Sequence, residues 1–157
     1  MLRNNIVNDG KFAIATYKAA ADYKTGMGVV VDAVSGLVSV PTTETSADIY
    51  LLDKAPVPTG VNAAKTNFSD YEEEFVTVKE NDKCLAVKYV AGESFITDQF
   101  DATTIKSSVI GERVAVNASG KWTVASSASS YILENVTTDN GHAVAVIRVS
   151  DTSVANN

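Results

Sequence analysis

The stretch GMGVVVDAVSGLVSVPTT, residues 26–43, decides the fold class of this chain. A valine run at 29–31 leads into Ser35-Gly36, and a second apolar run at 37–40 leads back out. Ser-Gly between two apolar runs indicates a turn, because glycine tolerates the positive φ that a tight turn requires. The stretch therefore predicts a β-hairpin.

A second hairpin is predicted near the end of the chain. Asn140-Gly141 separates apolar runs at 131–136 and 143–149. Asn-Gly between such runs is the strongest short signal for a hairpin turn. The run at 143–149 is apolar almost without interruption, which predicts a central strand buried on both faces.

Two further turns are predicted between apolar runs. Residues 117–120 form one, and Asn81-Asp82 forms the other, where it separates the run starting at Phe75 from the run at 84–90. The second turn predicts a hairpin between its two flanking runs.

Short apolar runs separated by turn residues continue along the whole chain, and no segment keeps a helical period. About eight or nine short strands are typical of a β-barrel or a β-sandwich. The sequence therefore predicts a small all-β fold. We expect an extended N-terminal arm at residues 1–10, a single β domain at 11–150 and a polar C-terminal tail at 151–157.

Composition narrows the class of partner. The chain has 157 residues, 45% of them hydrophobic and 20% charged, enough for a core without disulfides or metals. Its formal net charge of −6 argues against a nucleic-acid partner and against an anionic membrane surface.

The compartment is predicted from three observations. The N-terminal sequence lacks the apolar segment of a signal peptide, and no apolar run has the length of a membrane span. Cys84 is the single cysteine, which rules out an internal disulfide framework. We expect Cys84 to be a buried small apolar residue in a chain that folds in a reducing cytoplasm.

Side chains that carry chemistry are sparse. His142 is the single histidine, and it follows a predicted turn, where an exposed position is expected. Asp70 and the run 72–74 are acidic, but their spacing matches no EF-hand loop. A glycosidase would need two placed carboxylates, and the sequence singles out no pair. We therefore expect no enzymatic activity, no catalytic or metal site and no cofactor.

Aromatic residues leave a second class open. Trp122 and Tyr131, with further tyrosines elsewhere, would bind sugars if they formed an exposed stacking surface. On strands, such residues are more often core or cross-strand partners. A ligand- or carbohydrate-binding β-sandwich therefore remains an alternative.

Three segments resemble the capsid cement proteins, or head decoration proteins, of tailed bacteriophages. The first is IATYKAAADYKTGMGVVV at 14–31, the second is IGERVAVNASGKWTV at 110–124, and the third is Asn140-Gly141 followed by 143–149. The matching positions of the first segment are Tyr17, Ala19, Ala20, Ala21, Asp22, Gly26 and 29–31. The segments cover about a third of the chain, judged by their strand-and-turn pattern. Residues 48–100 match no part of that family's pattern and are a candidate inserted subregion.

The resemblance implies a small β-barrel-like module that binds the outer surface of a phage capsid and stabilises it without catalysis. It implies the major capsid protein lattice as partner, a homotrimer as the oligomer, and the virion as location after synthesis in the host cytoplasm. Other β-rich virion parts remain alternatives: a tail tube, a tail terminator or a head-fibre base. The candidate interface residues are Leu2, Ile6 and Val7 in the arm, Pro56 and Pro58 in a loop, and Phe95, Ile96 and Phe100.

Overall fold

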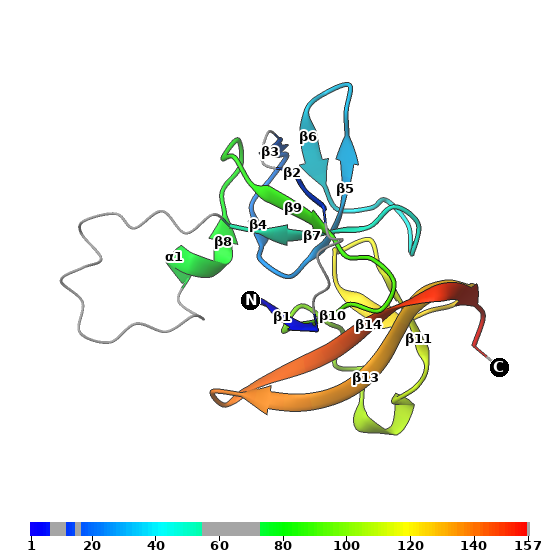
Figure 1. Ribbon diagram of the computed structural model, residues 1–157. Helices are drawn as coiled ribbons and strands as arrows, with labels where there is room; N and C mark the ends of the chain where they lie inside the picture. The colour runs from blue at the N-terminus through cyan, green and yellow to red at the C-terminus, as the bar shows by residue number, and fades with distance from the viewer. Residues whose placement is uncertain (7–11, 15–16, 55–72, 157) are drawn as a thin grey trace.

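The computed structural model describes residues 1–6, 12–14, 17–54 and 73–156. These residues are almost all β, in two six-stranded sheets and a two-stranded ribbon (Figure 1). The predicted all-β class is confirmed. The described strands outnumber the eight or nine expected, because several contain only two or three residues, and they do not close into a barrel.

The first sheet is antiparallel throughout and contains the longest strands. Its strands, in spatial order, are β1 (Leu2–Ile6), β10 (Ser94–Thr97), β14 (His142–Val154), β13 (Ser129–Asp139), β11 (Arg113–Val116) and β12 (Trp122–Val124). A 3₁₀ turn, η2 (Ser107–Val109), precedes β11.

The second sheet lies above the first in Figure 1. Its strands, in spatial order, are β2 (Phe12–Ile14), β9 (Leu85–Lys88), β7 (Tyr50–Asp53), β5 (Gly28–Asp32), β6 (Leu37–Ser39) and β3 (Lys18–Ala19). The ribbon pairs β4 (Tyr23–Lys24) with β8 (Thr77–Val78), which follows the single helical turn α1 (Glu73–Val76).

The two principal hairpins are where the sequence predicts them. β5 pairs with β6 through Val31 and Val38, and Gly36 between them has φ +71°. β13 pairs with β14, and Asn140 and Gly141 form their turn with φ of 48° and 83°. Strand β14 lies between β10 and β13, and its residues 144–147 are buried, which confirms the prediction of a central strand.

The hairpin predicted around Asn81-Asp82 is wrong. The turn exists, with φ 66° at Asn81, but β8 pairs with β4 whereas β9 pairs with β2 and β7. Strand β3 occupies the place of the expected partner. The Ala19 amide donates to the Asp82 carbonyl at 3.0 Å, and the Asn81 amide donates to the Ala19 carbonyl at 2.9 Å.

These contacts make the second sheet curl. Strand β3 pairs in parallel with β6 on one side, and on the other side the Cys84 amide donates to the Tyr17 carbonyl at 3.2 Å. The far edge of the sheet therefore returns to the segment that leads into β9. The curl encloses a hydrophobic cluster, which we call the small-residue cluster, made of Ala19, Val29, Val38, Leu52, Val78, Cys84 and Ala86.

A larger cluster, which we call the aromatic core, lies between the two sheets and consists of Ile49, Leu51, Val87, Tyr89, Phe95, Phe100, Ile105, Val114, Val116, Trp122, Tyr131, Leu133, Ala145, Ile147 and Val149. Four of its aromatic rings contact one another in series, tilted or edge to face. Their ring centroids are 5.0 Å apart for Tyr89 and Phe95, 5.3 Å for Phe95 and Trp122, and 4.8 Å for Trp122 and Tyr131. Leu51 belongs to the aromatic core and Leu52 to the small-residue cluster, because successive side chains of a strand point to opposite faces.

Both predicted chain ends are corrected in part. We predicted an extended arm at residues 1–10, but Leu2–Ile6 form an edge strand of the first sheet, while 7–10 lie outside the described residues. The tail predicted from residue 151 is the end of β14 as far as Val154. Beyond Val154, the side-chain amide of Asn156 donates to the backbone carbonyls of Arg113 and Ala125, both at 3.0 Å.

Candidate functional site

The candidate interface residues on β10 and beside it are mostly core residues. Phe95 is fully buried in the aromatic core, and Phe100 belongs to the same cluster. Ile96, between them, is half-buried. Packing inside the molecule therefore explains both phenylalanines.

The candidate interface residues of the arm and the loop are placed in part. Leu2 packs against the aromatic core, and Ile6 pairs with Ser94 at the end of β1. Val7, Pro56 and Pro58 lie outside the described residues. The structure therefore does not bring the predicted set together into one described surface.

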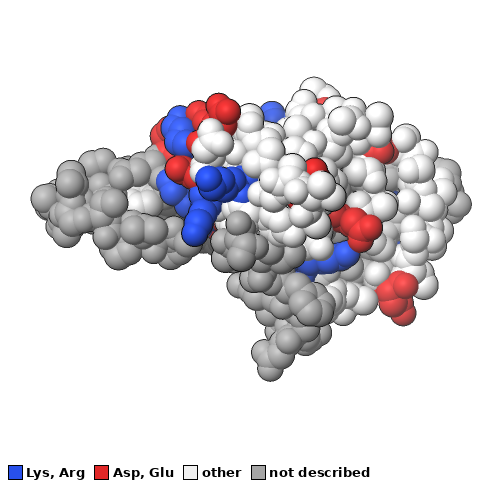
Figure 2. Space-filling model, turned by 90° about the horizontal axis from the view of Figure 1, so that it is seen from above, with Lys and Arg blue, Asp and Glu red and all other residues white. Residues whose placement is uncertain are grey.

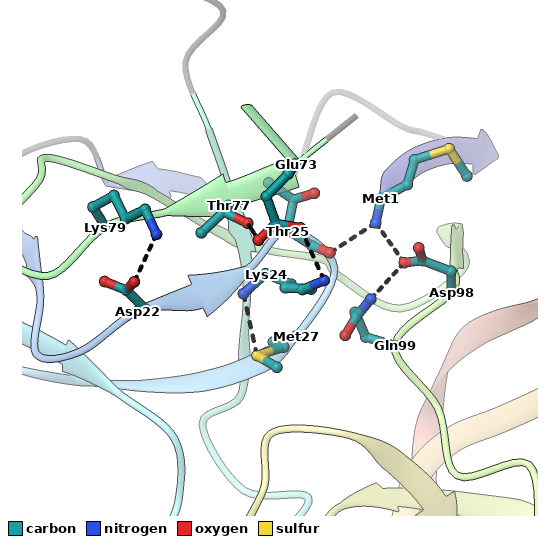
Figure 3. A network of polar contacts seen from close by, with 10 residues as sticks. All are labelled: Met1, Asp22, Lys24, Thr25, Met27, Glu73, Thr77, Lys79, Asp98 and Gln99. Carbon is teal, nitrogen blue, oxygen red and sulfur yellow. Dashed lines mark hydrogen bonds and ion pairs between the residues drawn. The ribbon is translucent and has the colours of Figure 1, made fainter. Parts of the chain in front are cut away.

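Strand β1 is anchored by the buried amino group of Met1 (Figure 3). This group donates to the Thr25 carbonyl at 2.9 Å and forms an ion pair with Asp98, which also accepts a hydrogen bond from Gln99 at 2.9 Å. Burial lowers the pKa of the amino group, and Asp98 opposes that shift. A side chain at position 26 would overlap the Met1 carbonyl, so the close approach of Met1 to Gly26 requires glycine there.

Charged side chains gather at one end of the molecule, as Figure 2 shows. Lys79 pairs with Asp22 at 2.8 Å, and Lys24 pairs with Glu73 at 3.3 Å (Figure 3). The hydrogen bond from Lys79 lowers the pKa of Asp22, and a hydrogen bond from Thr77 does the same for Glu73. We call this region the charged end.

Much of the remaining surface in Figure 2 is uncharged. Residues 33–47 contain one charged side chain, Glu44, and its carboxylate accepts the amide and the hydroxyl of Ser126, both at 2.7 Å. The Ser46 hydroxyl donates to the Ala128 carbonyl at 3.1 Å. Two Ser/Thr/Ala-rich loops, 42–47 and 126–128, are thus held side by side, and we call them the serine-rich loops.

The tip of the β5–β6 hairpin carries a single charged side chain, the exposed Asp32. Asp32 accepts the Val34 amide at 2.9 Å and the Ser35 hydroxyl at 2.6 Å, and these bonds hold its pKa below the usual range. Val34 is 98% exposed. Sequence reasoning located this turn but missed its exposed valine. An Asp three residues before Ser-Gly is the available signal, because Asp in that position stabilises turns.

The aromatic residues do not support a sugar-stacking surface built on Trp122 and Tyr131, because both are buried. Burial also raises the pKa of Tyr131. Tyr50 is half-buried. Lys88 Nζ lies over one face of its ring, 5.4 Å from the ring centroid, so that face is occupied. Tyr71 lies outside the described residues.

One acidic side chain inside the molecule escaped the sequence analysis. Glu93 is fully buried, and one of its carboxylate oxygens accepts the Val90 amide at 2.9 Å. The other oxygen has no hydrogen-bond partner among the described residues, and the same holds for Trp122 Nε1. A shallow depression of about 330 Å³ lies beside the segment between Val90 and Glu93. It is lined by Ala91, Gly92, Arg148, Val149, Ser150 and Asp151.

Within the described ranges, no three His, Cys, Asp or Glu side chains are grouped so as to hold a metal ion. In the same part of the chain, no helix has the length and apolar character needed to cross a membrane. His142 is exposed, as expected for a residue beside a turn.

Comparison with family models, with curated proteins and with solved structures finds no match for this chain. Its function is therefore inferred from its own residues and from the sequence resemblance.

Proposed function

We propose that this chain is a non-enzymatic structural protein that binds the outer surface of a bacteriophage capsid and stabilises it. Its partner is the lattice of the major capsid protein, its own oligomer is a trimer, and its place is the virion. The proposal begins from the resemblance to capsid cement proteins, and two features of the described residues support it.

The observation that carries the proposal is where the resembling residues lie. The segment 14–31 includes β3 and most of β5, which belong to the curled sheet, and β4, which belongs to the ribbon. A side chain at Gly28 would overlap Val116 of β11, and one at Gly26 would overlap Met1. Gly26 is one of the resembling positions and Gly28 lies in the same segment, so the resemblance includes a glycine on which the junction of the two sheets depends, and this favours a shared scaffold.

The distribution of charge is the second support. Lys79 pairs with Asp22 and Lys24 with Glu73 at the charged end, whereas the serine-rich loops and the hairpin tip carry one carboxylate each, Glu44 and Asp32, and both accept hydrogen bonds within the molecule. The centres of protein–protein interfaces are depleted in charged residues. Many copies on one lattice also multiply a modest affinity per site. Such a surface suits a protein shell better than a nucleic acid or an anionic bilayer.

Sedimentation of the protein from its native source tests the proposal. We expect the chain to travel with DNA-filled particles of virion size, in a fixed molar ratio to a major coat protein. Stripped particles should lose heat stability and regain it when the purified chain is added back. A chain that sediments only as a small free species contradicts the proposal and brings forward the ligand-binding β-sandwich.

The trimer is tested separately by sedimentation equilibrium of the purified chain. A mass of about three chains agrees with the resemblance, since cyclic homo-oligomers are the usual assemblies. A monomer that nevertheless binds particles keeps the decoration role and removes only the trimer.

A further inference from the structure

The first residue of the chain lies inside the molecule, between residues 25–26, which lead into β5, and residues 97–99 at the end of β10 (Figure 3). Met1 is 4% exposed, and its amino group contacts the Thr25 carbonyl and the Asp98 carboxylate. Burying a charged group is costly unless it is paired and hydrogen-bonded, so chain ends usually lie at the surface. This amino group is both paired and hydrogen-bonded. We call residues 25–26 and 97–99 the amino-group site.

The amino-group site is held together by hydrogen bonds of its own. The Thr97 hydroxyl donates to the Gly26 carbonyl at 3.0 Å, and the backbone amide of Gln99 donates to that hydroxyl, also at 3.0 Å. The side-chain amide of Gln99 donates to the Asp98 carboxylate at 2.9 Å. None of these three bonds involves the end of the chain. The carboxylate is therefore positioned for a positively charged group by the strands around it.

The amino-group site also selects the shape of what enters it. A side chain at position 26 would overlap the Met1 carbonyl, so the incoming backbone lies directly against Gly26. Beyond Met1, Leu2 packs against the aromatic core, and Leu2–Ile6 pair antiparallel with β10. The ligand that fits is therefore a free ammonium group at the start of an extended chain whose first residues are apolar.

We propose that the amino-group site is a binding site for a free terminal ammonium group, and that its occupation decides whether β1 stays on the first sheet. Strand β1 is the edge strand of that sheet and pairs with β10 alone. While the ammonium group is bound, β10 is an internal strand between β1 and β14. When the group is blocked or displaced, β10 becomes the edge, and an uncovered edge is a template for pairing with another chain. The inference does not depend on the capsid role.

The chemistry of the amino-group site distinguishes a free amino group from a blocked one. An ammonium group has several N–H donors and a positive charge, so it satisfies the Thr25 carbonyl and the Asp98 carboxylate together. An acylated or peptide-bonded nitrogen has one N–H donor and no charge. It would leave a largely buried carboxylate, 18% exposed at its side chain, without its ion pair, and such a loss is costly. Blocking the amino group should therefore weaken the attachment of β1.

The test compares the full-length chain with the same chain carrying one added glycine before Met1. The addition moves the ammonium group along the chain by about 3.8 Å, away from Asp98. Native-state hydrogen exchange of the β10 amides that pair with β1 should then accelerate at least about tenfold, while the β13–β14 hairpin keeps its rates. Asp98→Asn should accelerate the same amides in the original chain and add little in the extended chain, because the pair is already lost there. Asp151→Asn, at an exposed carboxylate on β14, is the matched control and should change nothing.

Acylation of the native chain gives a second readout that needs no variant. A terminal amino group ordinarily reacts before lysine side chains, because its pKa is lower. We expect the reverse order here, with Met1 modified after the exposed Lys121, and the ordinary order in the extended chain. Unchanged exchange in the extended chain, or modification of Met1 first in the native chain, overturns the inference. Additive effects of the glycine and Asp98→Asn overturn it too, because they show that Met1 acts through packing alone.

Discussion

The aromatic core and the small-residue cluster are built from different side chains, although they lie on the two faces of the same sheet. In the aromatic core, the ring of Tyr89, which follows β9 of the second sheet, contacts the ring of Phe95 of the first sheet. The small-residue cluster contains no aromatic residue among its fully buried members and relies on residues such as Ala19 and Ala86. Large rings fill a wide space between sheets, whereas small side chains let strands approach and the sheet curl.

The comparison shows that a single strand supplies side chains to both clusters. In β7, Leu51 faces the rings and Leu52 faces the small side chains, and both are fully buried. Truncating a large apolar side chain in either cluster leaves a cavity. The resulting loss in the free energy of unfolding depends on how far the surrounding side chains relax into that cavity. Substitutions in the two clusters should therefore differ in their cost to the free energy of unfolding.

The largest effect is expected at the centre of the aromatic core. Trp122→Ala should lower the free energy of unfolding by about 3–5 kcal/mol, because it removes a fully buried ring that contacts Phe95 and Tyr131. Urea unfolding followed by circular dichroism measures it. Trp122→Phe is the control, and it should cost much less, since Trp122 Nε1 has no hydrogen-bond partner among the described residues. A cost below about 1 kcal/mol for Trp122→Ala contradicts the central place of this ring.

The adjacent leucines of β7 give a matched pair. Leu51→Ala and Leu52→Ala should each cost about 2–5 kcal/mol by the same measurement. Their local effects should differ, because Cys84 lies in the small-residue cluster and burial raises the pKa of its thiol. Native-state alkylation of Cys84 should accelerate in Leu52→Ala and much less in Leu51→Ala. Equal acceleration in the two variants means that the clusters open together.

The close approach between the two sheets is tested at Gly28. Its amide donates to the Gly120 carbonyl at 2.9 Å, and an added Cβ would overlap the side chain of Val116. Gly28→Ala should therefore cost about 1–3 kcal/mol through overpacking. In Gly36→Ala the added Cβ has open space, and the penalty of about 1–2 kcal/mol comes from the positive φ alone. Unfolding midpoints that rise for Gly28→Ala rule out the tight contact.

The smallest effect is expected from the charged end. Lys79 and Thr77 hold the pKa values of Asp22 and Glu73 below their ordinary values. A carboxyl with a lowered pKa in the folded state contributes stability above its unfolded pKa, and that contribution is lost as pH falls through the folded pKa. The melting temperature should therefore fall modestly below about pH 4, and Asp22→Asn should reduce that slope. High salt should weaken the same slope, because these pairs are exposed.

Local turn chemistry explains why parts of this fold were predictable. The turns at Ser35-Gly36 and Asn140-Gly141 carry residues that accept positive φ, and the apolar runs beside them pair as expected. The turn at Asn81 was predictable too, but the strands with which its two flanking runs pair were not. Which strand pairs with a given run depends on β3, a two-residue strand with no apolar period of its own.

The candidate site was less accessible to sequence reasoning. Phe95 and Phe100 are apolar, and the sequence alone does not separate a core residue from an interface residue. The exposure of Val34 follows from the turn that Asp32 closes, and the pairing of Glu44 with Ser126 follows from a tertiary contact between distant loops. Periodicity reports which face of a strand is apolar, but it does not report what covers that face.

The long hairpin formed by β13 and β14 has a consequence for the order of folding. Its pairing begins at Asp139 and His142 across a two-residue turn, so its first contacts close a very short loop. The pairing of Leu2 with Thr97 joins residues far apart in the sequence and must wait for that longer closure. We therefore expect φ-values to be high near Val136 and close to zero at Leu2. Strand β1 is then the last element to join the sheet and the first to leave it under load.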